Sequence, residues 1–140
     1  MRVYADASLL VGLFVSDKFR SRGREFIARA RPTLLVSDFA AAEFASVLAR
    51  RVRTRELAAE AARRALAAFD AWSTSRSRRI ELTSSDVARA DSFLRRLDLN
   101  LRTPDALNIA IAERFNAALG TFDVRMADAA RAVGLEVAPA

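Results

Sequence analysis

Residues 101–112, Leu-Arg-Thr-Pro-Asp-Ala-Leu-Asn-Ile-Ala-Ile-Ala, form the stretch around which we expect the rest of the chain to fold. Thr103 can accept hydrogen bonds from the free amides at a helix start, and Pro104 suits the first helical position. The residues that follow are almost all apolar, which is typical of a helix buried on every side. Yet Asp105 lies in the first turn, and Asn108 lies one turn later on the same side. The pattern therefore predicts a buried helix with a carboxylate at its tip, which either caps the helix or faces a cation.

The segments before and after this helix alternate between short apolar stretches and helical patterns. The predicted strands cover residues 2–5, 33–36, 80–82, 117–121 and 135–137, and the other predicted helices cover residues 8–15, 19–30, 38–53, 56–72, 86–97 and 123–133. We expect Ser37 or Asp38 to cap the helix 38–53, and Ser84 or Ser85 to cap the helix 86–97. A polar break is expected at Ser73–Ser77, Gly120 should weaken its strand, and Gly134 should end the last helix. Short strands that alternate with helices favour a parallel sheet covered on both faces. We expect a single α/β domain that fills residues 1–140.

The composition narrows the chemistry that this chain can perform. Of its 140 residues 52% are hydrophobic, which is enough for a core, and no apolar run reaches membrane-spanning length. The chain has no histidine and no cysteine, which excludes histidine-based catalysis, histidine-bound zinc, disulfides and thiolate chemistry. Any metal must be held by oxygen, which favours Mg²⁺ or Mn²⁺. Asp6 comes too early for a signal peptide, so we expect a cytoplasmic protein.

The charge of the chain is strongly basic. The net charge is +6, the isoelectric point is about 11.2, and Lys18 is the only lysine among 23 basic residues. This balance suits a polyanion or an acidic protein partner. An arginine content set by genomic base composition explains it equally well, so the charge alone does not decide the function.

Two carboxylates fall where a parallel α/β sheet binds ligands, beyond the carboxyl ends of its strands, and a third opens a buried helix. Asp6 follows the first predicted strand, and Asp123 follows the strand 117–121, beside the hydroxyl of Thr121. Asp105 opens the buried helix. Each of these acids, taken alone, can be explained as a helix cap or a turn residue. A ligand site requires that they lie close together in the fold.

A fourth carboxylate, Glu43, lies on an apolar stripe of the helix 38–53. Phe39 precedes it by four residues and Val47 follows it by four, so all three share one helix face. An unpaired carboxylate there would be costly to bury. Four acids that meet at one sheet edge would repel one another unless a divalent cation or an arginine lies among them. The sequence therefore predicts either a metal site held by oxygen ligands or an arginine-neutralised cluster.

The order and context of these acids resemble those of the PIN-domain nucleases, in particular the VapC-type toxins of bacterial type II toxin–antitoxin systems. The matching segments run along the whole chain: Val3-Tyr4-Ala5-Asp6-Ala7-Ser8, Ser37 with Ala42-Glu43-Phe44, Leu101–Ala110, Thr121-Phe122-Asp123, and Met126–Ala130. The segment Leu101–Ala110 is the most specific of them. The fold that this resemblance implies is a three-layer α/β/α sandwich with a central parallel sheet of about five strands.

The resemblance also assigns roles to individual residues. The acidic quartet that binds Mg²⁺ or Mn²⁺ and carries catalysis would be Asp6, Glu43, Asp105 and Asp123. Supporting positions would be Ser8 near the first acid, Thr121 beside the last, and Asn108, where many relatives have histidine. Arg102 is a candidate for RNA binding. The group Arg50, Arg51, Arg53 and Arg55 is another candidate, but its pattern is equally typical of a solvent-exposed turn. Asp128 would lie behind the ligands or on the surface, and Tyr4 and Trp72 would be packing residues.

The implied activity is that of a metal-dependent endoribonuclease which hydrolyses RNA phosphodiesters with an activated water. The implied partners are an RNA substrate, a cognate antitoxin and a second copy of the chain, with exposed apolar residues on the helices 38–53 and 56–72 as the dimer interface. No membrane association is expected. No nucleotide cofactor is expected either, because the four glycines are scattered and form no nucleotide-binding loop.

Other classes of function compete with this one. A phosphoacceptor domain is disfavoured, because position 8 is Ser8 rather than a second aspartate and Lys18 does not follow a late strand. A catalytically silent PIN-like module that binds RNA or protein is the main alternative. In a third interpretation, an arginine neutralises the acids and no metal binds.

Overall fold

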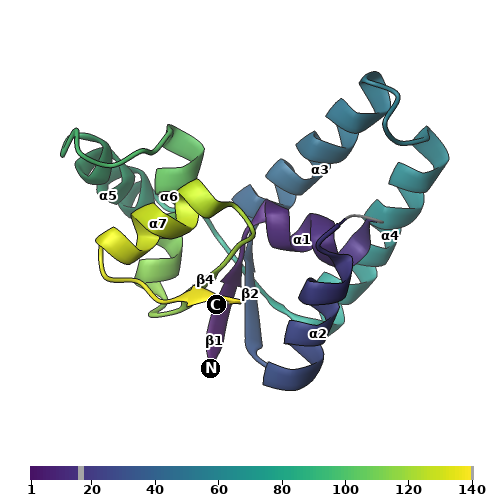
Figure 1. Ribbon diagram of the computed structural model, residues 1–140, viewed down its shortest axis with the longest axis horizontal. Coiled ribbons are helices and arrows are strands. Elements are labelled where there is room, and N and C mark those ends of the chain that lie inside the picture. The colour runs from purple at the N-terminus through teal and green to yellow at the C-terminus, as the bar shows by residue number, and fades with distance from the viewer. Residues whose placement is uncertain (16–17, 140) are drawn as a thin grey trace.

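The computed structural model describes residues 1–15 and 18–139, and its centre is a sheet of five parallel strands (Figure 1). The strands are β1 (Arg2–Ala5), β2 (Thr33–Ser37), β3 (Arg78–Ile80), β4 (Ala118–Gly120) and β5 (Val137–Ala138), in the order β3-β2-β1-β4-β5. The helices are α1 (Ala7–Phe14), α2 (Arg20–Ala30), α3 (Asp38–Arg53), α4 (Ala59–Arg76), α5 (Ser84–Leu94), α6 (Thr103–Arg114) and α7 (Val124–Ala132). The predicted α/β sandwich with about five parallel strands is confirmed.

Alternate residues of the central strands pack against different helices. Tyr4 of β1, with Leu35 and Leu119 on the strands beside it, shares a core with α5, α6 and α7. Ala5 and Val36 belong to a second core with α1, α3 and α4. The helices therefore form one layer on each side of the sheet, as Figure 1 shows. In the part of the chain that is described, no helix is long and apolar enough to cross a membrane.

Helix α6 is the buried helix that residues 101–112 predict. Every residue from Asp105 to Ala112 is buried, which follows from its position between the sheet and α5. Its start lies one residue earlier than predicted: Arg102, not Thr103, is at the N-cap, and Pro104 is therefore the second helical residue rather than the first. The Asp105 carboxylate folds back and accepts a hydrogen bond from the backbone N–H of Arg102 at 3.0 Å. Asp105 itself thus closes the helix start, and the Thr103 hydroxyl is not needed for it.

The predicted polar break at Ser73–Ser77 is wrong. Helix α4 begins at Ala59 and continues through this segment to Arg76. The hydroxyls of Ser73 and Thr74 donate to the carbonyl of Asp70, and Ser75 donates to Ala71, so the hydroxyls bond within the helix instead of ending it. The strand β3 also differs from the prediction: it covers Arg78–Ile80 rather than residues 80–82, so only Ser77 separates it from α4.

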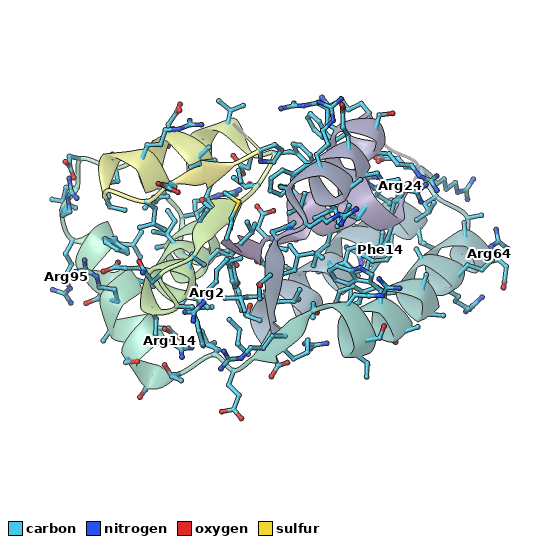
Figure 2. The ribbon with its side chains drawn as sticks, turned by 90° about the horizontal axis from the view of Figure 1, so that it is seen from below. Arg2, Phe14, Arg24, Arg64, Arg95 and Arg114 are labelled. Atoms are coloured by element: carbon cyan, nitrogen blue, oxygen red, sulfur yellow. The ribbon has the colours of Figure 1, made fainter. Side chains whose placement is uncertain are left out.

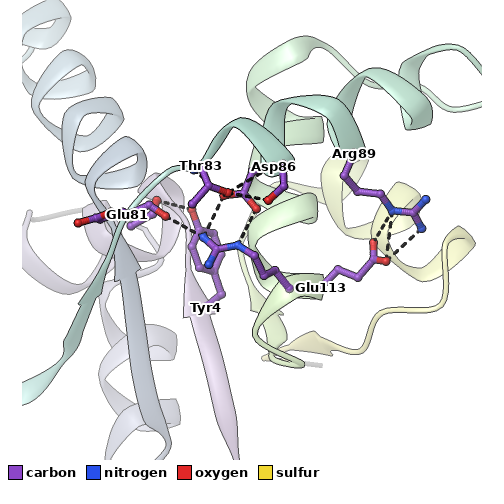
Figure 3. Close-up of polar contacts among 9 residues, drawn as sticks. Tyr4, Glu81, Thr83, Asp86, Arg89 and Glu113 are labelled. Atoms are coloured by element: carbon purple, nitrogen blue, oxygen red, sulfur yellow. Dashed lines mark hydrogen bonds and ion pairs between the residues drawn. The ribbon is translucent and has the colours of Figure 1, made fainter.

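Thr83 caps α5, where Ser84 or Ser85 was predicted. Its hydroxyl accepts from the backbone N–H of Asp86, and the Asp86 carboxylate accepts from the backbone N–H of Thr83 at 2.9 Å. Ion pairs join this helix to α6, as Figure 3 shows for Arg89 with Glu113. The second pair, between Asp86 and Arg114, joins a carboxylate that is 1% exposed to a guanidinium at 2.8 Å.

Gly120 is a requirement of the packing rather than a weakness of β4. A Cβ atom at this position would lie 2.7 Å from Val3 Cγ1 and 2.8 Å from Leu9 Cδ2. Only glycine lets β1 and α1 approach β4 this closely. The carbonyl of Gly120 also accepts a hydrogen bond from the backbone N–H of Asp6 at 3.0 Å, which ties the ends of the two strands together.

Candidate functional site

A pocket of about 480 Å³ opens at the carboxyl ends of the central strands. The four acids that line it come from four different elements: Asp6 after β1, Glu43 on α3, Asp105 on α6, and Asp123 at the N-cap of α7. The structure thus brings together side chains that are up to 117 positions apart in the sequence, counted from position 6 to position 123. The predicted convergence of the acids is present in the geometry.

Asp6 forms the floor of the pocket and is only 2% exposed. It caps α1 by accepting the backbone N–H of Leu9 at 2.9 Å, and it accepts the hydroxyls of Ser8 at 2.8 Å and Thr121 at 2.5 Å. Burial raises the pKa of Asp6 to about 6 in spite of these hydrogen bonds, and the negative charge of Asp123 adds to the increase. Both hydroxyl residues predicted to support the site therefore contact its first acid.

Glu43 is half-buried and is held by the amide of Asn108. Asn108 Nδ2 donates to Glu43 Oε1 at 2.7 Å and to the carbonyl of Pro104 at 3.0 Å. Burial raises the pKa of Glu43, and the charges of Asp6 and Asp105 raise it further. This mutual repulsion is what a shared cation would relieve.

Asp105 and Asp123 are each anchored through one oxygen. Asp105 Oδ2 accepts the backbone N–H of Arg102 and forms an ion pair with Arg125 Nη2 at 3.3 Å. Asp123 Oδ1 accepts the backbone N–H of Met126 at 3.1 Å and so begins α7. Arg125 was not predicted as a site residue, because nothing in the spacing of the sequence indicates that α7 and α6 meet here.

Three of the acids leave their second oxygen open. Among the described residues no partner contacts Glu43 Oε2, Asp105 Oδ1 or Asp123 Oδ2, and no buried side-chain oxygen lacks a partner, so these three oxygens reach solvent. The ordered side of each carboxylate is held by the protein, and the free side is available to a ligand. Oxygen donors of this kind suit a hard divalent cation.

The acids do not form a ready-made coordination cage. Within residues 1–15 and 18–139 no three of them lie close enough together to hold one ion directly. Mg²⁺ usually keeps several waters and takes one or two carboxylates from the protein. The donor set would therefore suit a hydrated cation that one or two of the acids hold directly.

The arginine interpretation holds for only one acid. Arg125 pairs with Asp105, but elsewhere in the described chain no arginine lies within ion-pair distance of Asp6, Glu43 or Asp123. The other predicted arginines divide into two sets. Arg50, Arg51 and Arg102 line the pocket, whereas Arg53 and Arg55 do not. Asp128 is a surface residue, since its side chain is 71% exposed and pairs with Arg131.

Tyr4 packs in the core as predicted and also has polar contacts that were not predicted. It is fully buried and packs in the core, as expected, but its hydroxyl contacts Asn108 Oδ1 and Ser37 Oγ, both at 2.6 Å. Burial raises the pKa of the Tyr4 phenol far above its usual range, so the phenol stays protonated. No sequence signal could separate this hydroxyl from a packing tyrosine, because its partners lie 33 and 104 residues away.

Comparisons with known proteins agree with this architecture. A sequence model of the PIN domain matches residues 3–132. Ribonuclease VapC46 of Mycobacterium tuberculosis is 33% identical over 138 residues, which cover 96% of this chain and 95% of that protein. The crystal structure of Mycobacterium tuberculosis VapC20, a sarcin-ricin loop cleaving toxin, matches with a TM-score of 0.74 at 20% identity over 95% of both chains. VapBC2 of Rickettsia felis, bound to a DNA fragment from its promoter, matches with a TM-score of 0.67 at 18% identity over 98% of this chain and 97% of that one.

Proposed function

The chain belongs to the PIN-domain family, and from this premise we propose that it is a metal-dependent endoribonuclease that acts as the toxin of a toxin–antitoxin pair. The observation that carries the proposal is the pocket in which four acids meet and three of them keep one carboxylate oxygen open. A silent binding module would have no need to keep these charges close together at the cost that the raised pKa values of Asp6 and Glu43 indicate.

We assign the acids as the residues that hold Mg²⁺ or Mn²⁺. Glu43, Asp105 and Asp123 offer their open oxygens, and Asp6 offers Oδ2, which only Thr121 contacts. When bound, a divalent ion lowers the pKa of a water and polarises the phosphodiester that the water attacks. Glu43 Oε2, which is open while Asn108 holds Oε1, would be the oxygen placed to accept a proton from an attacking water.

The arginines at the rim of the pocket supply the contacts to the RNA backbone. Arg102 lies at the N-cap of α6, and Arg50 lies on α3 in the opposite layer, where it lines the same pocket. Phosphate contacts of this kind set affinity and make it depend on salt. Among the described residues that line the pocket, Phe19 is the one aromatic side chain, so we expect base stacking to contribute little there.

The first test is cleavage of purified cellular RNA by the isolated chain, freed of any partner. Cleavage is expected with Mg²⁺ or Mn²⁺ and should disappear with EDTA. The Asp105→Asn variant should lose at least about 10³-fold in rate, because it removes a charged ligand. The Asp128→Asn variant is the matched control on the exposed surface and should cleave like the wild type. Equal cleavage by the wild type and Asp105→Asn would show that the activity lies elsewhere.

The antitoxin partner has a candidate surface at the C-terminal end of α1, beside α2 and α4. Two adjoining pockets of about 280 and 480 Å³ share Leu13, Phe14 and Arg24 and continue along α4 to Arg64. Figure 2 shows Phe14 with Arg24 and Arg64 around it. Apolar residues flanked by arginines suit an acidic amphipathic helix, and we propose that the antitoxin contributes one.

A charge-reversal experiment tests this surface. The double variant Arg24→Glu/Arg64→Glu should bind the antitoxin at least about tenfold more weakly, because like charges then face the acidic helix. RNA cleavage should be unchanged, since neither residue lines the acidic pocket. Arg95→Glu, at the opposite edge of the molecule in Figure 2, should bind the antitoxin normally. If the two sets of variants lose affinity equally, the effect is one of overall charge and the assigned groove is wrong.

The homodimer remains a prediction. Among the described residues, the large hydrophobic side chains with high exposure are Met1, Leu82, Val87, Leu97 and Val124, and none of them lies on α3 or α4. The larger apolar residues of these two helices are buried or partly exposed. Light scattering at increasing protein concentration measures the molar mass and tests the dimer. The mass of a monomer at every concentration would contradict self-association.

A further inference from the structure

A chain of buried hydrogen bonds connects the centre of the sheet to Glu43. It begins at Ser37 on β2, passes through the Tyr4 hydroxyl on β1 at 2.6 Å, and reaches Asn108 Oδ1 on α6 at another 2.6 Å. It ends where Asn108 Nδ2 donates to Glu43 Oε1 at 2.7 Å. Ser37, Tyr4 and Asn108 are at most 2% exposed, so water does not interrupt the chain. The mechanism proposed above gives Tyr4 no role.

The donors and acceptors leave only one arrangement of the protons. Both protons of Asn108 Nδ2 are used, one by Glu43 Oε1 and one by the carbonyl of Pro104. Asn108 Oδ1 therefore faces the Tyr4 hydroxyl, which has a single proton and donates it. The Ser37 hydroxyl must then donate to Tyr4, while it accepts from the backbone N–H of Ala40. Each bond of the chain has a fixed direction.

We propose that Tyr4 is a positioning residue of the metal site, which keeps the Asn108 amide turned so that its nitrogen holds Glu43 Oε1 and leaves Glu43 Oε2 open. The proposal rests on the function proposed above, because it concerns how the same acids bind a cation. If the amide turned over, its oxygen would face the Glu43 carboxylate and two acceptors would oppose each other. Mutation of a residue that hydrogen-bonds to a metal ligand commonly lowers metal affinity by about 10- to 100-fold.

The test is the Tyr4→Phe variant, which removes one oxygen and keeps the ring in the core. Mn²⁺ affinity, measured by titration calorimetry on the metal-free protein, is expected to fall about tenfold. Ser73→Ala is the matched control, because it removes a buried hydroxyl from α4, away from the pocket. Its Mn²⁺ affinity should stay within about twofold of the wild type, and circular dichroism should show both variants folded.

A double-mutant cycle with Glu43→Gln separates positioning from general damage to the fold. If Tyr4 acts through Glu43, Tyr4→Phe should cause little further loss of Mn²⁺ affinity in the Glu43→Gln background. Asn108→Ala breaks the same chain at its next member and should reproduce the loss, which keeps the proposal testable if Tyr4→Phe does not fold. Wild-type affinity in folded Tyr4→Phe, or an equal loss in both backgrounds, would overturn the proposal while the metal site stands. A wild-type chain that binds no Mn²⁺ would overturn the metal site itself, and this proposal with it.

Discussion

The Asp6→Asn variant is expected to lose RNA cleavage by at least about 10³-fold and, without metal, to be more stable than the wild type at pH 7. The loss of cleavage follows from the position of Asp6 on the floor of the pocket, where its charge balances that of the cation. The gain in stability follows from the same burial. Asparagine keeps one acceptor oxygen for Ser8 and Leu9 but carries no charge that has to be desolvated.

The pH dependence fixes the sign of the stability effect. Burial raises the pKa of Asp6 from 3.8 to about 6, so between these pH values the folded state binds more protons than the unfolded state. The free energy of unfolding therefore falls as the pH rises through this window, by up to about 3 kcal/mol. The Asp6→Asn variant lacks this decrease. Its net gain at pH 7 should be about 1–2 kcal/mol, because the Thr121 hydroxyl loses a charged acceptor.

Urea unfolding in EDTA, at several pH values between 4 and 7.5, measures this difference. The variant should be no more stable than the wild type at pH 4, and its advantage should grow with pH and level off above pH 6. Added Mg²⁺ should stabilise the wild type and not the variant. Asp128→Asn, on the exposed surface, should follow the wild type at every pH. A stability difference that does not change with pH would show that the ionisation of Asp6 is not its cause.

The Arg114→Met variant is expected to lose about 2–3 kcal/mol of unfolding free energy. Arg114 contacts both oxygens of Asp86, at 2.8 and 2.9 Å, and also donates to the carbonyl of Glu81 at 2.7 Å. Its removal leaves the buried Asp86 carboxylate with Thr83 alone (Figure 3). Breaking a buried pair costs about 3–5 kcal/mol, and we expect the lower end or less because the Arg114 side chain is 32% exposed.

This variant should also change its response to acid. Burial by itself would raise the pKa of Asp86, but hydrogen bonds from Arg114 and Thr83 outweigh it and hold the pKa below its ordinary value. In the wild type this pair therefore stabilises the fold above about pH 4, and the contribution is lost as the pH falls through the lowered pKa. Without Arg114, burial dominates, so the stability no longer rises with pH in this range.

Urea unfolding between pH 3 and 7 checks both effects. Arg89→Met is the matched control, because Arg89 forms its ion pair with Glu113 on the exposed surface of the same two helices (Figure 3). That variant should lose less than about 1 kcal/mol. Similar losses in Arg114→Met and Arg89→Met would mean that the burial of Asp86 does not decide the cost.

Local patterns in the sequence are sufficient for the parallel α/β sheet and for the buried helix α6. Hydrophobic periodicity, Pro104 and Gly134 act within a few residues of their own position. The sequence also places Asp6 and Asp123 at strand ends that meet at one edge of a parallel sheet, whereas Glu43 and Asp105 join them through the resemblance to the PIN-domain nucleases. The prediction was wrong at Ser73, because a serine hydroxyl can either end a helix or bond to a carbonyl within it. Ser73 does the second and donates to the carbonyl of Asp70 in α4.

Which oxygen of each acid is open, and what holds the other oxygen, depends on contacts that exist only in the folded molecule. The Arg125–Asp105 pair, the Asp86–Arg114 pair and the hydrogen bonds of Tyr4 join residues on different elements. Such contacts depend on how helices and strands pack and not on spacing along the chain, so no local pattern records them. The same holds for Gly120, whose missing side chain is needed only because Val3 and Leu9 arrive next to it.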